Sequence, residues 1–329
     1  MRPIRKILVA VKDLDSSNHP EVAKAAQLAK AFDATLEVFH ALATPVFVDL
    51  YSGSRVDLRK VEKERLAQAH RKLERIAERT RKHQVTVKTH VEWDYPTHEA
   101  IIRRAKKAKA NLIVVHTHEG GRGIKWLMRS TDWELLKLSP VPVLMVRTPR
   151  PYLHPTVLAA VDPAHLHAKP ARLDGEILEF TTSIAKAMKG TAHAMHAYMP
   201  PSMAAMAVFA QGVTAPVDLG SDAAAEKRAV ASLRRAVAKH GIPPQRRHAV
   251  ARHPIDAIPG TARKLKAHLL VMGALSRSGL KRVFIGNTAE QILDAVACDV
   301  LLVRPPKIKL KEVPGARAGM ALFSQPMPY

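Results

Sequence analysis

The chain carries one stretch twice, and this repeat constrains its fold more than any other feature. Residues 111–147 align with residues 268–304 at a constant offset of 157 positions and without a gap. A match of this kind marks two copies of one supersecondary unit, so one fold should describe both halves. The matched pairs are Leu112 with Leu269, Val114 with Val271, Thr131 with Thr288, Leu136 with Leu293, Val143 with Val300, Val146 with Val303 and Arg147 with Arg304.

Apolar runs of strand length alternate with helical patterns through the first half. Residues 4–11 are apolar at nearly every position, which is typical of a parallel strand covered on both faces. Alternation of strand and helix predicts a parallel α/β sheet. We expect strands at 4–11, 35–41, 85–93, 111–115 and 143–147, and helices at 20–32, 56–83, 97–109 and 131–138.

The same order returns in the second half. Residues 199–220, which are rich in Met, Ala and Pro, are expected to form a loop that covers a pocket. We expect strands at 156–161, 191–198, 248–252, 268–272 and 299–304, and helices at 174–189, 222–240, 255–266 and 289–297.

The fold class that follows is α/β, with two tandem doubly wound domains of five parallel strands each, related by a pseudo-two-fold axis. The expected domains are residues 1–150 and 151–305, joined by a stiff proline-rich linker at 148–155 and followed by a flexible basic tail at 306–329. In such sheets the ligand crevice lies at the carboxyl ends of the strands, where the strand order reverses.

The charge of the chain is unusually positive. Its 52 Lys and Arg against 29 Asp and Glu give a net charge of +23. Such a surface attracts nucleic acid or anionic lipid nonspecifically, although a solvated basic surface without a partner is an equal alternative. The aromatic content of 5% argues against a base-stacking surface. Because the apolar runs are only strand-length, we expect a cytoplasmic protein without a transmembrane segment.

One loop of the second half has the composition of an anion site. A strand ends at Gly273, a small and basic loop follows, and a helix opens after Gly286, with Thr288 and Gln291 spaced as a capping box. This order aims backbone N–H groups and a helix N-terminus at one point, which suits a phosphate. The spacing is neither a Walker A loop nor the dinucleotide-binding pattern. The candidate ligand-binding residues are Asp162, for a ribose hydroxyl, and Gly273, Ser276, Ser278, Gly279, Lys281, Arg282, Gly286, Asn287 and Thr288.

The first copy lacks these features. Large side chains occupy three of the glycine positions, a carboxylate lies where a phosphate would bind, and a lysine replaces the aspartate at the end of the first strand. The first half is therefore not expected to bind a nucleotide in the same way. The replacements are His116 for Gly273, Glu119 for Ser276, Arg122 for Gly279, Arg129 for Gly286 and Lys12 for Asp162.

The loop resembles that of the universal stress proteins, whose nucleotide-binding members carry G-x2-G-x9-G-S/T after the fourth strand. Gly273 and Gly286 match this pattern, Ser276 replaces the second glycine and Asn287 replaces the Ser/Thr. Residues 131–136 and 286–294 carry the likeness further, and the two fused copies are similar to the tandem E type of the family.

The resemblance implies a fold of the adenine nucleotide alpha hydrolase type and a cytoplasmic stress-response protein without established turnover. It also implies an internal pseudo-dimer of the two domains, joined through their last strands. Some members bind ATP and others do not. In the ATP-binding members an acidic residue at the position of Asp162 contacts the nucleotide.

The sequence nominates no catalytic residue and no metal site. His116, His118 and Glu119 lie close together, but a metal would need further ligands from elsewhere. His193 and His196 are expected to pack or to bond to the backbone, and Cys298 is expected to be a buried structural thiol. Nucleophile elbows and H-E-x-x-H motifs are absent.

Three functions remain open at this point. The first is a ligand-sensing or scaffold protein whose second half holds ATP or another phosphorylated or partly apolar ligand. The second is a weak nucleotide hydrolase or transferase. The third is a basic protein that binds nucleic acid or anionic lipid. Formation of a homodimer is compatible with each of them.

Overall fold

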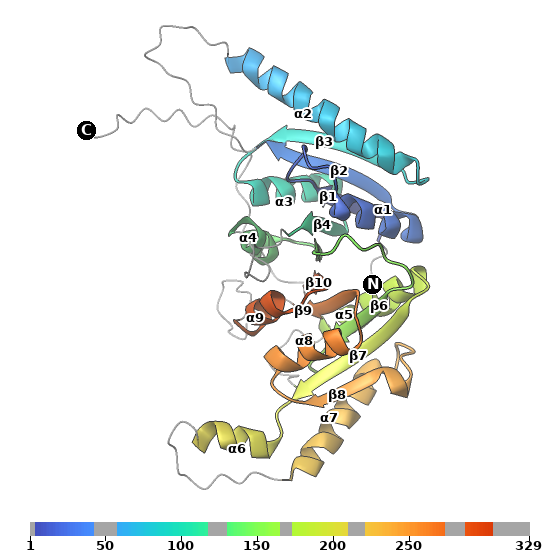
Figure 1. Ribbon diagram of the computed structural model, residues 1–329, viewed down its shortest axis with the longest axis vertical. Helices are drawn as coiled ribbons and strands as arrows, with labels where there is room; N and C mark the ends of the chain where they lie inside the picture. The colour runs from blue at the N-terminus through green and yellow to red at the C-terminus, as the bar shows by residue number, and fades with distance from the viewer. Residues whose placement is uncertain are drawn as a thin grey trace, which may run out of the picture. The chain divides into compact units, whose positions relative to one another are not determined.

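The computed structural model describes residues 4–42, 58–117, 130–164, 173–209, 221–273 and 287–304 (Figure 1). Two compact units divide the chain: Pro3–His116 with Met128–Val141 belongs to one, and Pro142–Lys309 to the other. The domain boundaries expected from the sequence stay a prediction.

The unit of the first half is a parallel sheet with strand order β3-β2-β1-β4. Helix α1 packs beside α2, and α3 beside α4, so the helices form two pairs, as in a doubly wound sheet. The elements are β1 (Lys6–Ala10), α1 (Pro20–Phe32), β2 (Thr35–Leu42), α2 (Leu58–Arg81), β3 (Val87–Trp93), α3 (Thr97–Ala108), β4 (Leu112–His116) and α4 (Ser130–Leu138).

The unit of the second half repeats this plan with strand order β5-β10-β9-β6-β7-β8. Its elements are β5 (Val143–Val146), β6 (Thr156–Ala160), α5 (Leu173–Ala187), β7 (Thr191–Tyr198), α6 (Pro201–Phe209), α7 (Asp222–Val237), η1 (Pro244–Arg246), β8 (Arg247–Ala251), α8 (Pro254–Lys264), β9 (Leu269–Gly273), α9 (Asn287–Ala295) and β10 (Asp299–Val303).

Strand β5 is the exception to the parallel arrangement. It pairs antiparallel with β10, with Leu301 opposite Leu144 and with Val300 and Leu302 opposite Met145 and Val143. Leu144 and Leu301 are equivalent positions of the repeat, so the two strands pair in the same way from both sides, as in a two-fold contact. The pairing agrees with the expectation that the last strands join. It also explains why β5 belongs to the compact unit of the second half.

Buried polar bonds hold the segment after β5 against α9 and β10. The Arg147 guanidinium donates to the carbonyl oxygens of Leu293 and Val296, at 2.5 and 2.6 Å, at the C-terminal end of α9. The fully buried Asp299 carboxylate accepts the backbone N–H of Arg147 at 2.9 Å and the Tyr152 hydroxyl at 2.6 Å. Burial and the Asp299 charge raise the pKa of Tyr152 well above its usual value. The linker predicted from prolines is therefore anchored by hydrogen bonds.

Two local predictions from the sequence were wrong. The segment predicted as a loop at 199–220 contains helix α6, which forms because Pro201 begins it and Ala and Met, both good helix formers, continue it. The helices expected to open at Thr131 and after Thr288 begin at Ser130 and Asn287. The two threonines therefore lie inside the first turn and are not the capping residues.

Candidate functional site

The expected crevice of the second half lies between β6 and β9, because the strand order reverses there. The order runs outward from β6 to β7 and β8 on one side and from β9 to β10 on the other. Val157 lies opposite Leu269 and Ala159 opposite Val271, so the two strands reach their carboxyl ends together. This register brings Asp162, which follows β6, to the same edge as Gly273, the last residue of β9. Ligands of doubly wound sheets bind at this point.

The structure describes four of the ten predicted site residues. Asp162 and Gly273 lie at the strand ends, and Asn287 and Thr288 form the first turn of α9, where Thr288 is exposed. The other six lie outside the described residues: Ser276, Ser278, Gly279, Lys281, Arg282 and Gly286.

Asp162 lies among polar groups of β7 and α5. Its backbone N–H donates to the Asp174 carboxylate at 3.3 Å, in the first turn of α5. His196 Nδ1 lies 3.8 Å from Asp162 Oδ1 and 3.3 Å from the carbonyl oxygen of Val161. The Asp162 side chain is 30% exposed while the His196 side chain is only 3% exposed. The carboxylate thus reaches the surface of the crevice over a buried histidine, a position from which it can accept hydrogen bonds from a ligand.

Gly273 has a packing role that the sequence did not show. A Cβ atom at this position would lie 2.6 Å from Cδ2 of Leu173 and 3.4 Å from Cδ1 of Ile177, both in α5. The two side chains are buried. The missing side chain therefore lets α5 pack closely against the end of β9, whatever else the glycine does in the crevice.

The equivalent edge of the first half is closed by charged side chains. Lys12, which stands opposite Asp162 in the repeat, forms an ion pair with the buried Asp132 in the first turn of α4. Asp132 corresponds to Ala289 in α9, so the second half has neither partner of this pair. The sequence identified Lys12 as a departure but gave no sign of its partner, which lies far away along the chain.

A second charged group fills the other side of the same edge. His116 replaces Gly273, and its Nδ1 lies 3.9 Å from Oε2 of Glu21, a buried residue in the first turn of α1. His19 Nδ1 lies 3.5 Å from the other oxygen of Glu21. The Glu21 carboxylate thus lies near the end of β4, and a negative charge there opposes an anionic ligand.

The family of the chain follows from its match to known sequences. The sequence profile of the universal stress protein family matches residues 3–147 and again residues 156–304. The chain belongs to the universal stress protein family. Two matched segments make it a tandem universal stress protein, as the repeat predicted, and membership supports a role in the stress response.

Known relatives place this universal stress protein beside the E type. It is 26% identical to the universal stress protein E homolog of Haemophilus influenzae over 226 residues, which cover 68% of this chain and 72% of the relative. Universal stress protein E of Escherichia coli is 28% identical over 67% of this chain and 69% of its own length.

Solved structures agree with this assignment. A protein of unknown function from Pseudomonas aeruginosa PAO1 has a TM-score of 0.70 and 26% identity, covering 93% of this chain and 94% of its own. A universal stress protein from Archaeoglobus fulgidus, at 16% identity, covers 90% of this chain and 98% of its own with a TM-score of 0.60 and shows the fold alone.

Other reactive groups of this universal stress protein have structural surroundings. Burial raises the pKa of the Cys298 thiol to about 11, so it stays protonated at neutral pH. The residue is partly buried, not fully buried as predicted. His196 bonds to the backbone as expected, whereas His193 instead lies 3.1 Å from His248, ring nitrogen to ring nitrogen. No cluster of three His, Cys, Asp or Glu that could hold a metal occurs among the residues that the structure describes.

None of the helices described in the structure has the length and apolar character needed to span a bilayer.

Proposed function

We propose that the second half binds ATP or another phosphorylated ligand in the crevice between β6 and β9. Through this ligand the chain would act as a sensor or scaffold in the stress response. The observation that carries the proposal is the contrast between the two halves at the same edge of the sheet. The first half fills this edge with the Lys12–Asp132 ion pair, whereas the second half has Asp162 and Ala289 at these positions.

The chemistry of the crevice supports a ligand with a sugar and a phosphate. Asp162 offers carboxylate oxygens to ribose hydroxyls, and the first turn of α9 offers backbone N–H groups to a phosphate. Lys281 and Arg282 would add positive charge from the loop, and Gly286 would leave room for the phosphate. This assignment of roles is part of the proposal.

We propose that the ligand is bound and not converted, because the family has no established turnover. The Asp174 carboxylate accepts the backbone N–H of Asp162, so the two acidic residues lie close together. The hydrolase alternative requires ADP to accumulate when the protein is incubated with ATP, and it requires Asp162→Ala to abolish that product.

Calorimetry with magnesium and ATP tests the proposal. We expect one site per chain and an affinity that falls about ten-fold in Asp162→Ala, because one hydrogen bond to a charged group contributes about 1.5 kcal/mol or more. Gly286→Arg, which copies Arg129 of the first half, should abolish binding without lowering the net charge.

Lys12→Ala is the matched control, since it alters the equivalent position of the first half and should leave the affinity for ATP unchanged. Undiminished affinity in Gly286→Arg would contradict the proposed site. Native mass spectrometry of the purified protein would identify a different retained ligand.

A further inference from the structure

Helix α6 presents apolar side chains to solvent. The helix has no charged residue. Met203 and Met206 lie three positions apart and so share one face, where they are 38% and 73% exposed, while Ala205 is buried on the other side. Met199, just before the helix, is 39% exposed. Few large apolar side chains are exposed elsewhere in the described chain, so their collection on this helix needs an explanation.

Helix α6 is fixed to the beginning of α7. The backbone N–H of Ser202 donates to Asp222 Oδ1 at 3.0 Å, and the Ser202 hydroxyl donates to the other oxygen of the same carboxylate. Helix α7 packs on β7 and on β8, the edge strand of the sheet, and α6 contacts α7 (Figure 1). The methionines therefore have a defined place next to α7.

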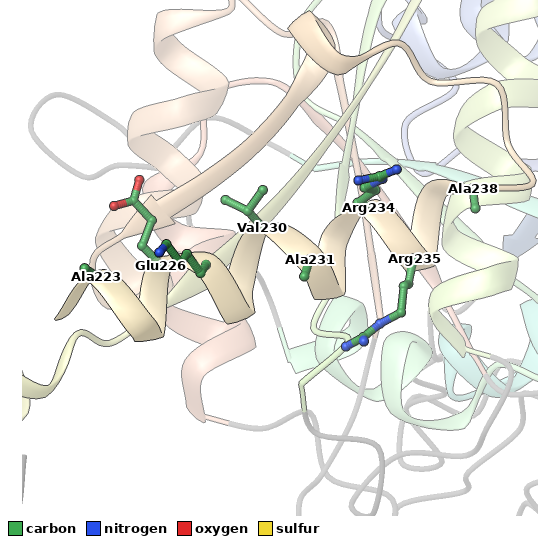
Figure 2. A pocket seen from close by; sticks show the side chains of 8 residues that line it. Ala223, Glu226, Val230, Ala231, Arg234, Arg235 and Ala238 are labelled. Carbon is green, nitrogen blue, oxygen red and sulfur yellow. The ribbon is translucent and has the colours of Figure 1, made fainter. Parts of the chain in front are cut away.

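Helix α7 carries exposed bases along its outward face, and Arg234 lies about three turns beyond the Asp222 contact. Figure 2 shows side chains of its outward face, among them Val230, Arg234 and Arg235, beside a hollow of about 770 Å³. Val230 is 49% exposed, and small alanines separate the charged residues. Between residues 222 and 239 the helix region carries five bases and two acids.

We propose that this surface docks onto an anionic lipid membrane. We define the α6–α7 surface as Met199, Met203, Met206, Lys227, Val230, Arg234 and Arg235. Protruding apolar side chains of α6 enter the boundary between headgroups and acyl chains, while Lys and Arg further along α7 contact lipid phosphates. The bases of this face outnumber its one acid, Glu226. A second copy of this chain is a poorer occupant, because the same bases would face each other.

Charge alone does not distinguish the α6–α7 surface from the rest of this basic protein. Helix α2 is also rich in Lys and Arg, with Arg71 and Arg75 exposed on its outer face. None of the α2 side chains that the structure describes is a large exposed apolar residue. The combination of methionine and arginine is what makes the α6–α7 surface suitable for lipid, and α2 provides a control of equal charge.

Vesicle sedimentation with the full chain tests the proposal. We expect binding to vesicles of phosphatidylcholine with phosphatidylglycerol and little binding to phosphatidylcholine alone. Arg234→Glu/Arg235→Glu should weaken binding to the anionic vesicles roughly ten-fold or more, since each base near the surface contributes about 1 kcal/mol. Met203→Ser/Met206→Ser should weaken it roughly five-fold or more, although the charge is unchanged.

The control variant Arg71→Glu/Arg75→Glu changes the net charge by the same amount and should weaken binding much less. Equal losses in the α2 and α7 variants, or unchanged binding in the methionine variant, would overturn the proposal in favour of nonspecific charge attraction. Sedimentation velocity without lipid tests whether a second copy of the chain occupies this surface instead. A dimer that the methionine variant converts to a monomer, with vesicle binding unaffected, would make the surface a contact between copies and would also overturn the proposal.

Discussion

At the scale of single residues, Gly273 allows close packing between β9 and α5. We predict that Gly273→Ala lowers the free energy of unfolding by about 1–3 kcal/mol, because the new Cβ would lie 2.6 Å from buried Leu173 and would push α5 away from β9. Urea denaturation measures this change. Gly175→Ala in the same helix is the control: nothing lies within 4 Å of its Cβ position, so it should be neutral or stabilising. Equal losses in both variants would contradict this explanation.

Residue types at strand ends could be read from the sequence, but their partners could not. The position of Asp162 and Gly273 at one edge followed from the strand pattern alone. The ion pair of Lys12 with Asp132 joins residues 120 positions apart, and only the folded sheet brings them together. The same applies to Asp174, whose bond to the backbone of Asp162 depends on where α5 begins. Short-range patterns contain no information on such contacts.

At the scale of elements, a pair of histidines joins β7 to the edge strand β8. The rings of His193 and His248 are stacked with centroids 5.4 Å apart. Burial lowers the pKa of both histidines. The ring of His248 and the charge of Arg246 lower the pKa of His193 further, and the charge of Lys264 lowers the pKa of His248 further. Both rings are therefore favoured in the neutral form, and the unfolded chain binds more protons than the folded one as the pH falls.

This difference predicts an acid-sensitive edge. The stability that the pair contributes is present above the unfolded pKa of about 6.5 and is lost as the pH falls through the lower folded values. Replacing both rings in His193→Phe/His248→Phe should reduce the loss of unfolding free energy between about pH 7.5 and pH 5. Denaturant titrations at the two pH values measure it. A double variant that keeps the wild-type pH dependence would contradict this account.

The elements themselves were largely predictable. Helix α1 and strand β7 have the predicted bounds, because Pro20 fixes the start of one and Gly190 and Pro200 enclose the other. Helix α6 was missed because Pro200, Pro201 and the methionines and alanines that follow, without charged residues, give no amphipathic period. The contact of Ser202 with α7 joins the helix to the rest of its unit, and a local sequence pattern contains no information on it.

At the scale of the whole molecule, the net charge of +23 should make stability depend on salt. Repulsion among like charges destabilises a compact chain, and salt screens it. We predict that the thermal midpoint rises by roughly 2–4 °C between about 20 and 300 mM sodium chloride, which corresponds to about 1 kcal/mol for a domain of this size. Differential scanning fluorimetry at several salt concentrations measures it. A falling midpoint would instead indicate that ion pairs such as Arg104–Glu37 dominate.

The repeat made the architecture of both halves predictable before any contact was known. A gapless offset requires equivalent strands and helices, and the parallel order β3-β2-β1-β4 indeed recurs as β8-β7-β6-β9. Apolar patterns do not specify which strand lies beside a sheet's last strand. The antiparallel direction of β5 therefore had to come from the structure, although the expected contact between the last strands pointed toward it.

The pairing of β5 with β10 makes the second copy of the repeat depend on a strand from the first. Strand β10 obtains its outer row of backbone partners from residues 143–145, which precede the second copy in the chain. In a shortened protein that started at residue 151, the backbone N–H and C=O groups at the outer edge of β10 would be unpaired. An unpaired strand edge of this kind pairs with strands of other molecules. Duplication followed by fusion thus supplies each molecule with its own strand, where two separate copies would have to find one another in the cell.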